Sequence, residues 1–340
     1  MRVVVLVVLL CLAGCAKDLT GTEPTTWSVG LAEPKITYLG VGGWLLHWKG
    51  EALLFAPSFS NPAFPPVFVS ADPERIDRYM PHVPDATVLL IGHAHYDHLL
   101  DVPLILQKYA PKAVAYGSAT AGHILAGAKP PPRFVNMEPK MVPVMCGGRA
   151  CPQVNPEQKW ERAGHFRFMA IESQHAPHIA GIDLLPGRYG RDLDSLPTYV
   201  RAWREGTTLA WLVDLLDDQG EPVYRIHYQD SASNPPYGFP PILQDGKGVD
   251  VAIICAASTD QVAQYPDALL KVLEPRLLLV GHWEDFFGND PETPQLIRLQ
   301  GRQQVELVDR LRKAYPNTVM PYPLTEVALP PPETGNAERR

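Results

Sequence analysis

The 340-residue chain lacks an excess of basic charge, a short-period repeat and an apolar run long enough to cross a membrane. Its 30 Lys and Arg are outnumbered by 37 Asp and Glu, and the formal net charge of −7 argues against a nucleic-acid-binding surface. The apolar run at residues 3–12 is shorter than the about 20 residues that a membrane-spanning helix needs. Because no linker is long enough to separate two units, one large domain is expected.

Proline, in contrast, is abundant. The sequence holds 36 Pro in an otherwise ordinary composition with 46% hydrophobic and 20% charged residues, and a share of about 5% Pro would be usual. Since proline removes a backbone donor and interrupts helices, we expect short helices and strands joined by long, stiff loops.

The N-terminus is typical of an exported protein. A basic start and the apolar run fit a signal peptide, and the run ends in Leu-Ala-Gly-Cys, which resembles the lipobox of bacterial lipoproteins. In such proteins the cysteine, here Cys15, is lipidated. The following Ala16 indicates the outer membrane by the sorting pattern of those proteins. We therefore expect a soluble, periplasm-facing chain held at the membrane by acyl chains; the alternative is an ordinary secretory signal.

These features divide the chain into four parts. They are a signal peptide at residues 1–14, a tether at 15–34, a folded domain at 35–328 and a flexible, Pro-rich and then polar tail at 329–340.

The cysteines agree with export. Cys146 and Cys151 lie five residues apart in a Gly-containing loop, and an oxidising compartment favours a disulfide between them. Free thiols and a metal knuckle are the alternatives. Cys255 lies in the apolar run VAIICAA and is expected in the core.

The domain alternates between apolar, β-branched runs and helical patterns, which predicts sheets covered by helices. The predicted strands are 36–41, 52–56, 87–92, 112–117, 166–173, 207–216, 222–230, 249–257 and 276–282. The predicted helices are 98–109, 118–127, 261–273 and 293–314.

The run IGHAHYDHLLD at residues 91–101 carries the strongest chemical signal. His93 and His95 alternate in an extended turn and point to the same side, while Asp97 and His98 follow at the start of a helix. Neutral imidazoles and a carboxylate at this density suit Zn²⁺, with iron and manganese as alternatives. A chance cluster on a solvated loop is disfavoured, because burying so much polarity without a metal would be costly.

The pattern resembles the metallo-β-lactamase superfamily, whose signature is HxHxDH after a strand, followed by a distant His, an Asp and a last His. Here IESQHAPH supplies His175, with His178 as the competing ligand. HYQDSAS supplies Asp230, and LLLVGHWEDFF supplies His282. The match covers about residues 36–290, most of the chain after the tether.

The resemblance implies a four-layer αββα sandwich with two metal ions at one edge of its sheets. His93, His95 and His175 would hold one ion, Asp97, His98 and His282 the second, and Asp230 would bridge both. It also implies a metallo-hydrolase that uses a metal-bound hydroxide, with Asp97 orienting the attacking water.

The sequence departs from the superfamily at one place. Where relatives carry an Asp at the end of an early strand, this chain has Ala56. The loss of a residue that supports metal ligands typically costs about 10–100-fold in affinity or activity, so a weakened, metal-binding envelope lipoprotein stays an alternative. Asp101 is expected on a helix surface, and the other histidines, such as His123, have no partner pattern.

Local motifs point to two branches of the superfamily. HxHYDH and the Gln-His step resemble phospholipase D-type members that act on N-acyl phosphatidylethanolamine, which favours a phosphodiester or phospholipid-like substrate. HWEDFF resembles lactonase-like members, so a lactone or other ester is the alternative. Relatives that perform redox chemistry would have Glu at the position of His95.

The long segment 176–206 is expected to contact substrate. It is rich in Arg and aromatic residues, and Arg188, Tyr189 and Arg191 suggest a lid over an anionic, partly apolar small molecule or lipid. The alternative is a surface loop whose arginines pair with Asp192, Asp194 and Glu205.

Overall fold

Two β-sheets of seven strands each form the centre of the fold. The structure is a computed structural model, and it describes residues 29–146, 148–151, 154–178, 181–288, 290–297 and 300–332. The predicted signal peptide, Cys15, most of the predicted tether and the end of the tail lie outside the described residues. Within the described part, none of the helices combines the length and the apolar character that a membrane span requires.

The first sheet places an antiparallel half beside a parallel half. Its order is β16 (Glu326–Ala328), β1 (Lys35–Gly40), β2 (Gly43–Trp48), β3 (Glu51–Phe55), β4 (Ala86–Leu90), β5 (Val114–Gly117) and β6 (Phe134–Asn136). The strands from β16 to β3 pair antiparallel, whereas β3 to β6 pair parallel.

The second sheet has the same mixed character. Its order is β15 (Thr318–Val319), β14 (Leu277–Gly281), β13 (Val251–Cys255), β12 (Pro222–Tyr228), β11 (Leu209–Leu216), β10 (Phe166–Glu172) and β9 (Glu161–Ala163). The strands from β9 to β12 pair antiparallel and those from β12 to β15 pair parallel.

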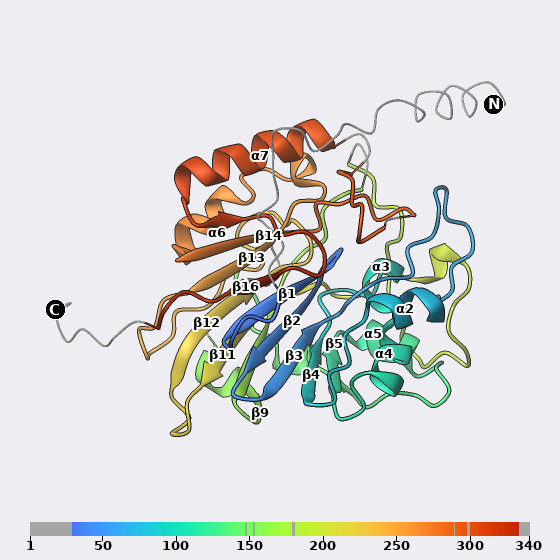
Figure 1. Cartoon of the computed structure of the whole chain (residues 1–340), viewed down its shortest axis with the longest axis horizontal. Helices are drawn as coiled ribbons and strands as arrows, with labels where there is room; N and C mark the ends of the chain where they lie inside the picture. The colour runs from blue at the N-terminus through green and yellow to red at the C-terminus, as the bar shows by residue number, and fades with distance from the viewer. Residues whose placement is uncertain are drawn as a thin grey trace.

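Helices cover the outer face of each sheet (Figure 1). On the first sheet they are α2 (Pro73–Tyr79), α3 (Tyr96–Leu99), α4 (Val102–Lys108) and α5 (Ala119–Leu125), and on the second they are α6 (Asp267–Leu273) and α7 (Gly301–Ala314). Short 3₁₀ turns lie at Glu138–Lys140, Pro156–Lys159, Val200–Ala202 and Thr259–Gln261. A separate two-stranded hairpin joins β7 (Met145–Cys146) to β8 (Arg149–Ala150).

The strand pattern creates two apolar layers at once. On β3, Leu53 and Phe55 pack into the cluster between the sheets, while Ala52 and Leu54 pack under α2–α5. Side chains alternate across a strand, so a continuous apolar run buries both faces. The predicted four-layer αββα sandwich is confirmed: it is the metallo-β-lactamase fold.

All nine predicted strands are present, with ends that differ by a few residues. The helix α2 was not predicted, nor were seven strands: β2, β6, β7, β8, β9, β15 and β16. The predicted helix 98–109 is divided between α3 and α4, where Pro103 lies in the first turn of the new helix. The predicted helix 261–273 starts only after Pro266, because proline lacks the N–H that a helix interior needs.

The predicted helix 293–314 is also shorter than expected, since α7 begins at residue 301. The described residues before it run along the segment after β14, where Leu296 forms a bridge with Glu284 and the N–H of Ile297 donates to the carbonyl of Trp283. Tertiary pairing therefore replaces the first turns of this predicted helix.

Candidate metal centre

The predicted ligands follow the carboxyl ends of four strands. His93 and His95 come after β4, His175 after β10, Asp230 after β12 and His282 after β14. Because β11 runs antiparallel between β10 and β12, and β12 to β14 are parallel, the carboxyl ends of β10, β12 and β14 lie at one edge of the second sheet. The sandwich brings the end of β4 to the same place.

Three imidazoles form the first ligand group. The potential ligand atoms of His93, His95 and His175 lie within 4.8 Å of one another. The Nε2 of His95 lies 3.2 Å from the carbonyl of Leu185, and the Nδ1 of His175 lies 2.6 Å from the carbonyl of Ala176. If these nitrogens carry the protons, as the carbonyls require, the Nδ1 of His95 and the Nε2 of His175 keep lone pairs for a metal.

A second group contains Asp97, His98 and His282, and Asp230 connects the two groups. The Oδ2 of Asp97 lies 3.5 Å from the Nε2 of His98 and 3.6 Å from the Nε2 of His282. The Oδ2 of Asp230 lies 3.2 Å from the Nδ1 of His93 and 3.6 Å from the Nδ1 of His98. All seven predicted ligands therefore come together, in three overlapping groups that could each hold an ion.

His178 lies beside the ligand groups, with its ring stacked on that of His175. Its ring centroid is 4.8 Å from that of His175, and its Nδ1 accepts a hydrogen bond from the backbone of Leu184 at 3.2 Å. Among the described residues it belongs to none of the ligand groups. The geometry thus favours His175 as the third ligand.

Burial sets the protonation of the cluster. Burial lowers the pKa of His98 to about 4 and lowers the pKa values of His95 and His175 well below the usual range of histidine. Burial opposes ionisation of Asp97, but the neighbouring His98 and His282 lower its pKa well below the ordinary value. Most of the cluster is therefore in the form that binds metal: neutral imidazole and ionised carboxylate.

His93 behaves differently because it lies against Asp230. Burial lowers its pKa, but the negative charges of Asp230 and Asp97 outweigh burial, so the net shift is upward. The pKa of Asp230 shifts downward, since His93 and His98 outweigh the effect of burial. Protons therefore compete with a metal mainly at His93.

The buried polar atoms of the cluster fit a metal better than they fit one another. Both ring nitrogens of His93, the Nδ1 of His98 and both carboxylate oxygens of Asp230 are buried and make no hydrogen bond with good geometry. Leaving such groups unpaired costs about 1–3 kcal/mol each. A cation at the three groups would satisfy these atoms, so the residues present fit the metal that the fold implies.

Two glycines make room for the ligands. A Cβ at Gly92 would lie 2.1 Å from Oδ2 of Asp230, and a Cβ at Gly42 would lie 2.6 Å from the ring of His98. Any side chain at either position would displace a ligand. These glycines were not predicted as part of the site. Gly92 lies within the run 91–101 that supplies four candidate ligands, whereas Gly42 follows the first predicted strand and is distant in sequence from every ligand motif.

His282 is held in a left-handed backbone conformation by a buried network. Its φ is 52°, and its N–H donates to the hydroxyl of Tyr38 at 2.8 Å. That hydroxyl in turn donates to Glu284, which also accepts from the backbone of Val41 and, at 3.1 Å, from Trp283. Tyr38 and Glu284 are fully buried. The sequence analysis did not identify Tyr38 or Glu284 as part of the site, because they lie 246 residues apart in the chain.

A cavity of about 270 Å³ opens beside the ligands. Its walls are mainly apolar, and they include Phe64, Leu184, Val200, Phe286 and Phe287. Asp97 lies in the wall, where the sequence places a catalytic carboxylate.

The arginines predicted to contact substrate do not line this cavity. Arg188, Tyr189 and Arg191 are absent from its walls among the described residues, and Arg201 from the same segment is present. The hydroxyl of Tyr189 instead donates to the carbonyl of Ala202 at 2.9 Å. A substrate role for these three residues stays a prediction.

Asp101 does not lie on a helix surface as expected, because it is fully buried. Its carboxylate accepts the N–H groups of Phe59 at 2.6 Å and Ser60 at 2.9 Å, and so holds the loop after β3 against the start of α4. Ala56 begins this loop and packs in the apolar layer under the helices. The loop is thus held by a carboxylate, that of Asp101 directly before α4.

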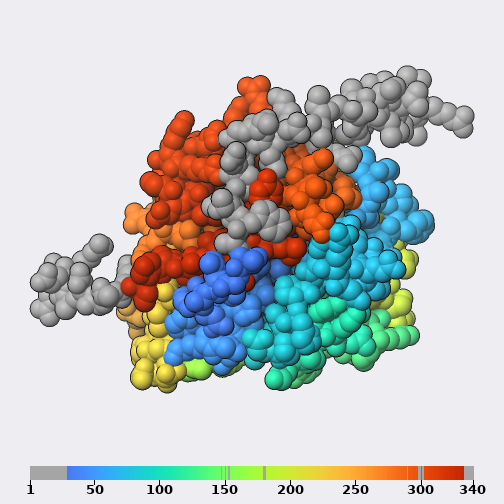
Figure 2. Space-filling model, viewed as in Figure 1, coloured from blue at the N-terminus to red at the C-terminus, as the bar shows by residue number. Residues whose placement is uncertain are grey.

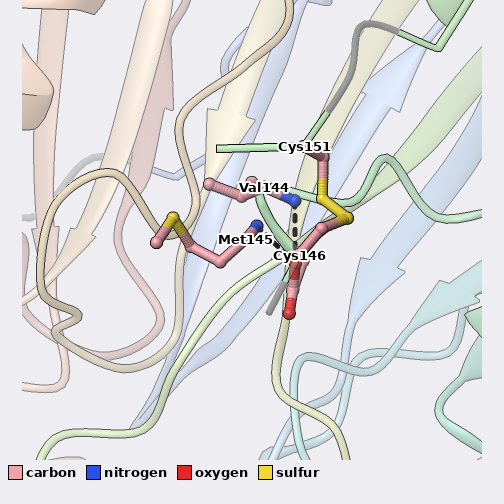
Figure 3. The surroundings of a disulfide bond; sticks show 5 residues. Val144, Met145, Cys146 and Cys151 are labelled. Carbon is pink, nitrogen blue, oxygen red and sulfur yellow. Dashed lines mark hydrogen bonds between the residues drawn. A yellow bond between two sulfur atoms is a disulfide. The ribbon is translucent and has the colours of Figure 1, made fainter. Parts of the chain in front are cut away.

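Cys146 and Cys151 form a disulfide (Figure 3). It closes the β7–β8 hairpin, whose first strand is held by Glu172: the carboxylate accepts from the backbone of Val144 at 2.7 Å and of Met145 at 3.0 Å. Cys255 is buried and free, as expected.

Comparison with known proteins shows similarity at the level of the fold. No protein-family model matches the sequence, and no curated protein does. Among solved structures, the chain is similar to CmlA, a diiron β-hydroxylase from Streptomyces venezuelae, at 14% identity and a TM-score of 0.50 over 89% of this chain. The alignment covers 55% of CmlA, so the chain spans about half of its length.

Two smaller proteins align over almost their whole length. Igni18, a metallo hydrolase from Ignicoccus hospitalis, is 12% identical with a TM-score of 0.46, covering 86% of this chain and 97% of Igni18. YhfI, a metallo-β-lactamase fold protein from Bacillus subtilis, is 13% identical with a TM-score of 0.48, covering 86% of this chain and 98% of YhfI.

Proposed function

We propose that the protein is a metal-dependent hydrolase that binds two metal ions, zinc in first place and iron or manganese as alternatives. The observation that carries this proposal is the convergence of seven His and Asp side chains, six of them buried and His175 partly buried, beside an open cavity. Bound ions would polarise the scissile group and lower the pKa of a coordinated water. His93, His95 and His175 would hold one ion, and Asp97, His98 and His282 the other, with Asp230 between them.

The protein's own residues prepare the site for this chemistry. The backbone carbonyls of Leu185 and Ala176 fix the orientation of His95 and His175. The Tyr38–Glu284 network fixes His282, and Gly92 lets Asp230 approach β4. The Asp97 carboxylate lies in the cavity wall, and in this proposal it orients water or substrate there. Preorganised groups of this kind act without reorganising during the reaction.

The substrate that we favour is a phosphodiester or phospholipid-like molecule, and a lactone or other ester is the alternative. The apolar cavity walls support a substrate with an apolar part. A protein that binds metal weakly and turns over no substrate is the remaining alternative, which rests on Ala56.

The test is turnover by the zinc-loaded protein on a panel of phosphodiester, carboxyl ester, lactone and β-lactam substrates. We expect hydrolysis of the phosphodiester or the ester, with loss of activity in His95→Ala and normal activity in His123→Ala, since His123 pairs with the exposed Asp192. No turnover of any substrate by a protein that holds two ions would contradict the proposal.

We also propose that the chain is a periplasm-facing outer-membrane lipoprotein anchored through Cys15. Cys15→Ser should release the chain into the soluble fraction or leave it unprocessed. Unchanged membrane partition of that variant would contradict the anchor.

A further inference from the structure

The cavity next to the ligands combines aromatic walls with a single strongly basic side chain. Phe64 and Phe287 meet edge to face at 5.1 Å between ring centroids, and Phe286 and Phe287 lie 4.4 Å apart. Phe286 also contacts the ring of His282 at 5.4 Å. An aromatic wall thus extends from a metal ligand to the surface.

This wall joins segments that are distant in the sequence. Figure 2 shows the segment after β14, in orange, against the blue loop between β3 and α2. The N–H of Gly288 donates to the carbonyl of Pro62 at 3.1 Å and fixes this contact. The wall is therefore held in place before any substrate arrives.

Exposed apolar side chains lie in the cavity wall and close to it in the chain. Of the ten large hydrophobic side chains that are exposed in the described residues, Phe64 and Leu184 line the cavity. Four more lie within two residues of a lining residue and are called the rim here: Val67, Phe68, Ile182 and Tyr199. Phe68 and Tyr199 also pair with each other through a β-bridge. Backbone hydrogen bonds hold the rim together: Val200, in the cavity wall, donates to Val67 at 3.0 Å, and Val69 donates to Thr198 at 2.8 Å. Single exposed apolar residues are common, but a cluster at a cavity mouth indicates a binding surface.

Arg201 brings positive charge to this apolar surface. It is the one Arg or Lys among the described residues of the cavity wall. Within the described part of the chain it has no ion pair, whereas its neighbour Arg204 donates to the carbonyl of Arg188 at 2.9 Å and lies over the ring of Tyr189. The alternative interpretation pairs this segment's arginines with acidic residues such as Asp192. Among the described residues Asp192 contacts His123 at 2.8 Å, and no ion pair joins it to an arginine.

We propose that the cavity recognises its substrate as an amphiphilic anion. The negative group contacts the guanidinium of Arg201, and the apolar group lies against Phe64, Phe286 and Phe287. Longer apolar chains continue over the rim at Phe68 and Tyr199. That the bound anion is a substrate rests on the proposed hydrolase function. The binding itself needs no metal.

The test compares octanoate with octanol, which share an apolar chain and differ in charge. Titration calorimetry measures both affinities in the metal-free protein, where no ion can bind the carboxylate of octanoate. We expect octanoate to bind about tenfold more tightly than octanol, the effect of one charge-assisted hydrogen bond. Arg201→Met should remove this preference without changing the affinity for octanol, and Arg201→Lys should retain part of it.

Three further variants separate the contribution of the charge from that of the aromatic wall. Arg204→Met, at an exposed arginine of the same segment that lies outside the cavity, should leave the preference intact. Phe287→Ala should weaken both ligands by the same factor. Phe68→Ser should lower the affinity for dodecanoate but not for octanoate, because only the longer chain reaches the rim. Each buried methylene group contributes about fourfold to the binding constant.

Equal binding of octanoate and octanol to the wild-type protein would overturn the inference. So would a loss of preference in Arg204→Met as large as that in Arg201→Met, or unchanged binding of both ligands to Phe287→Ala. These outcomes are separate from the proposed hydrolysis: a preference in the metal-free protein supports the subsite without any turnover, and turnover without a preference contradicts the subsite alone.

Discussion

Replacing Tyr38 by Phe should damage the metal site without touching a metal ligand. The substitution removes only the hydroxyl that accepts the N–H of His282 at 2.8 Å and donates to the buried carboxylate of Glu284. The orphaned N–H costs about 1–3 kcal/mol, and a lost hydrogen bond to a charged group costs about 1.5–3 kcal/mol. Because the two losses share one site, we expect about 3 kcal/mol of lost stability.

The backbone of His282 adds a second consequence. A residue at φ 52° is strained by about 1–3 kcal/mol and keeps that conformation only when its surroundings hold it. Without the hydroxyl, the ring of His282 should leave Asp97 and His98. The affinity for the second metal ion should then fall by about 10–100-fold, the usual effect of losing a group that supports a ligand.

Tyr265→Phe is the matched control. The hydroxyl of Tyr265 is also buried and accepts one backbone N–H, from Cys255 at 3.1 Å, but that residue is not a ligand. Urea unfolding should show a loss of stability in both variants, whereas zinc titration should show weaker binding of the second ion in Tyr38→Phe alone. Two ions bound with wild-type affinity by Tyr38→Phe would refute the reasoning.

Three other perturbations follow from the structure. Gly92→Ala should lower metal content by displacing the carboxylate that joins the two ligand groups, which metal analysis would detect. Replacing Cys146 and Cys151 by Ser should lower the unfolding free energy by about 2 kcal/mol, the loop-closure value for so short a loop, and unchanged urea unfolding would contradict this. Burial raises the pKa of Asp245, but hydrogen bonds from the buried Arg225 lower it to about 2, against an ordinary 3.8. The stability that ionised Asp245 adds is therefore present above its unfolded pKa and is lost as pH falls toward 2. Asp245→Asn should lower the free energy of unfolding by about 1 kcal/mol near neutral pH, a value reduced for solvent screening, and by less in acid. An equal cost at both pH values in urea unfolding would argue against it.

The sequence was most informative where a single short segment carries the signal. The HxHxDH run and the apolar strand before it predicted four ligands and the strand that positions them, because their geometry is local. His175, Asp230 and His282 could be placed through the superfamily pattern, and the structure brings all of them to one sheet edge. The geometric preference for His175 over His178 needed the fold, since both lie in the same loop.

Features that depend on contacts between distant segments could not be predicted from the sequence. Tyr38 and Glu284 are 246 residues apart, and no spacing links them. Arg201 could not be told from Arg188 and Arg191 by composition. Hydrogen bonds that join Thr198 and Val200 to the loop after β3 bring this part of the segment to the cavity, and these contacts are not local in sequence. The buried position of Asp101 likewise depends on backbone N–H groups some forty residues away.

The central claim is that two metal ions share one site built from both halves of the sandwich, and metal content at equilibrium tests it most directly. Wild-type protein dialysed against zinc should hold two equivalents. His95→Ala and His282→Ala should each hold fewer, although these ligands belong to different groups, while His123→Ala should hold two. A wild-type protein with only trace metal, or a His282→Ala protein that keeps two equivalents, would contradict the account.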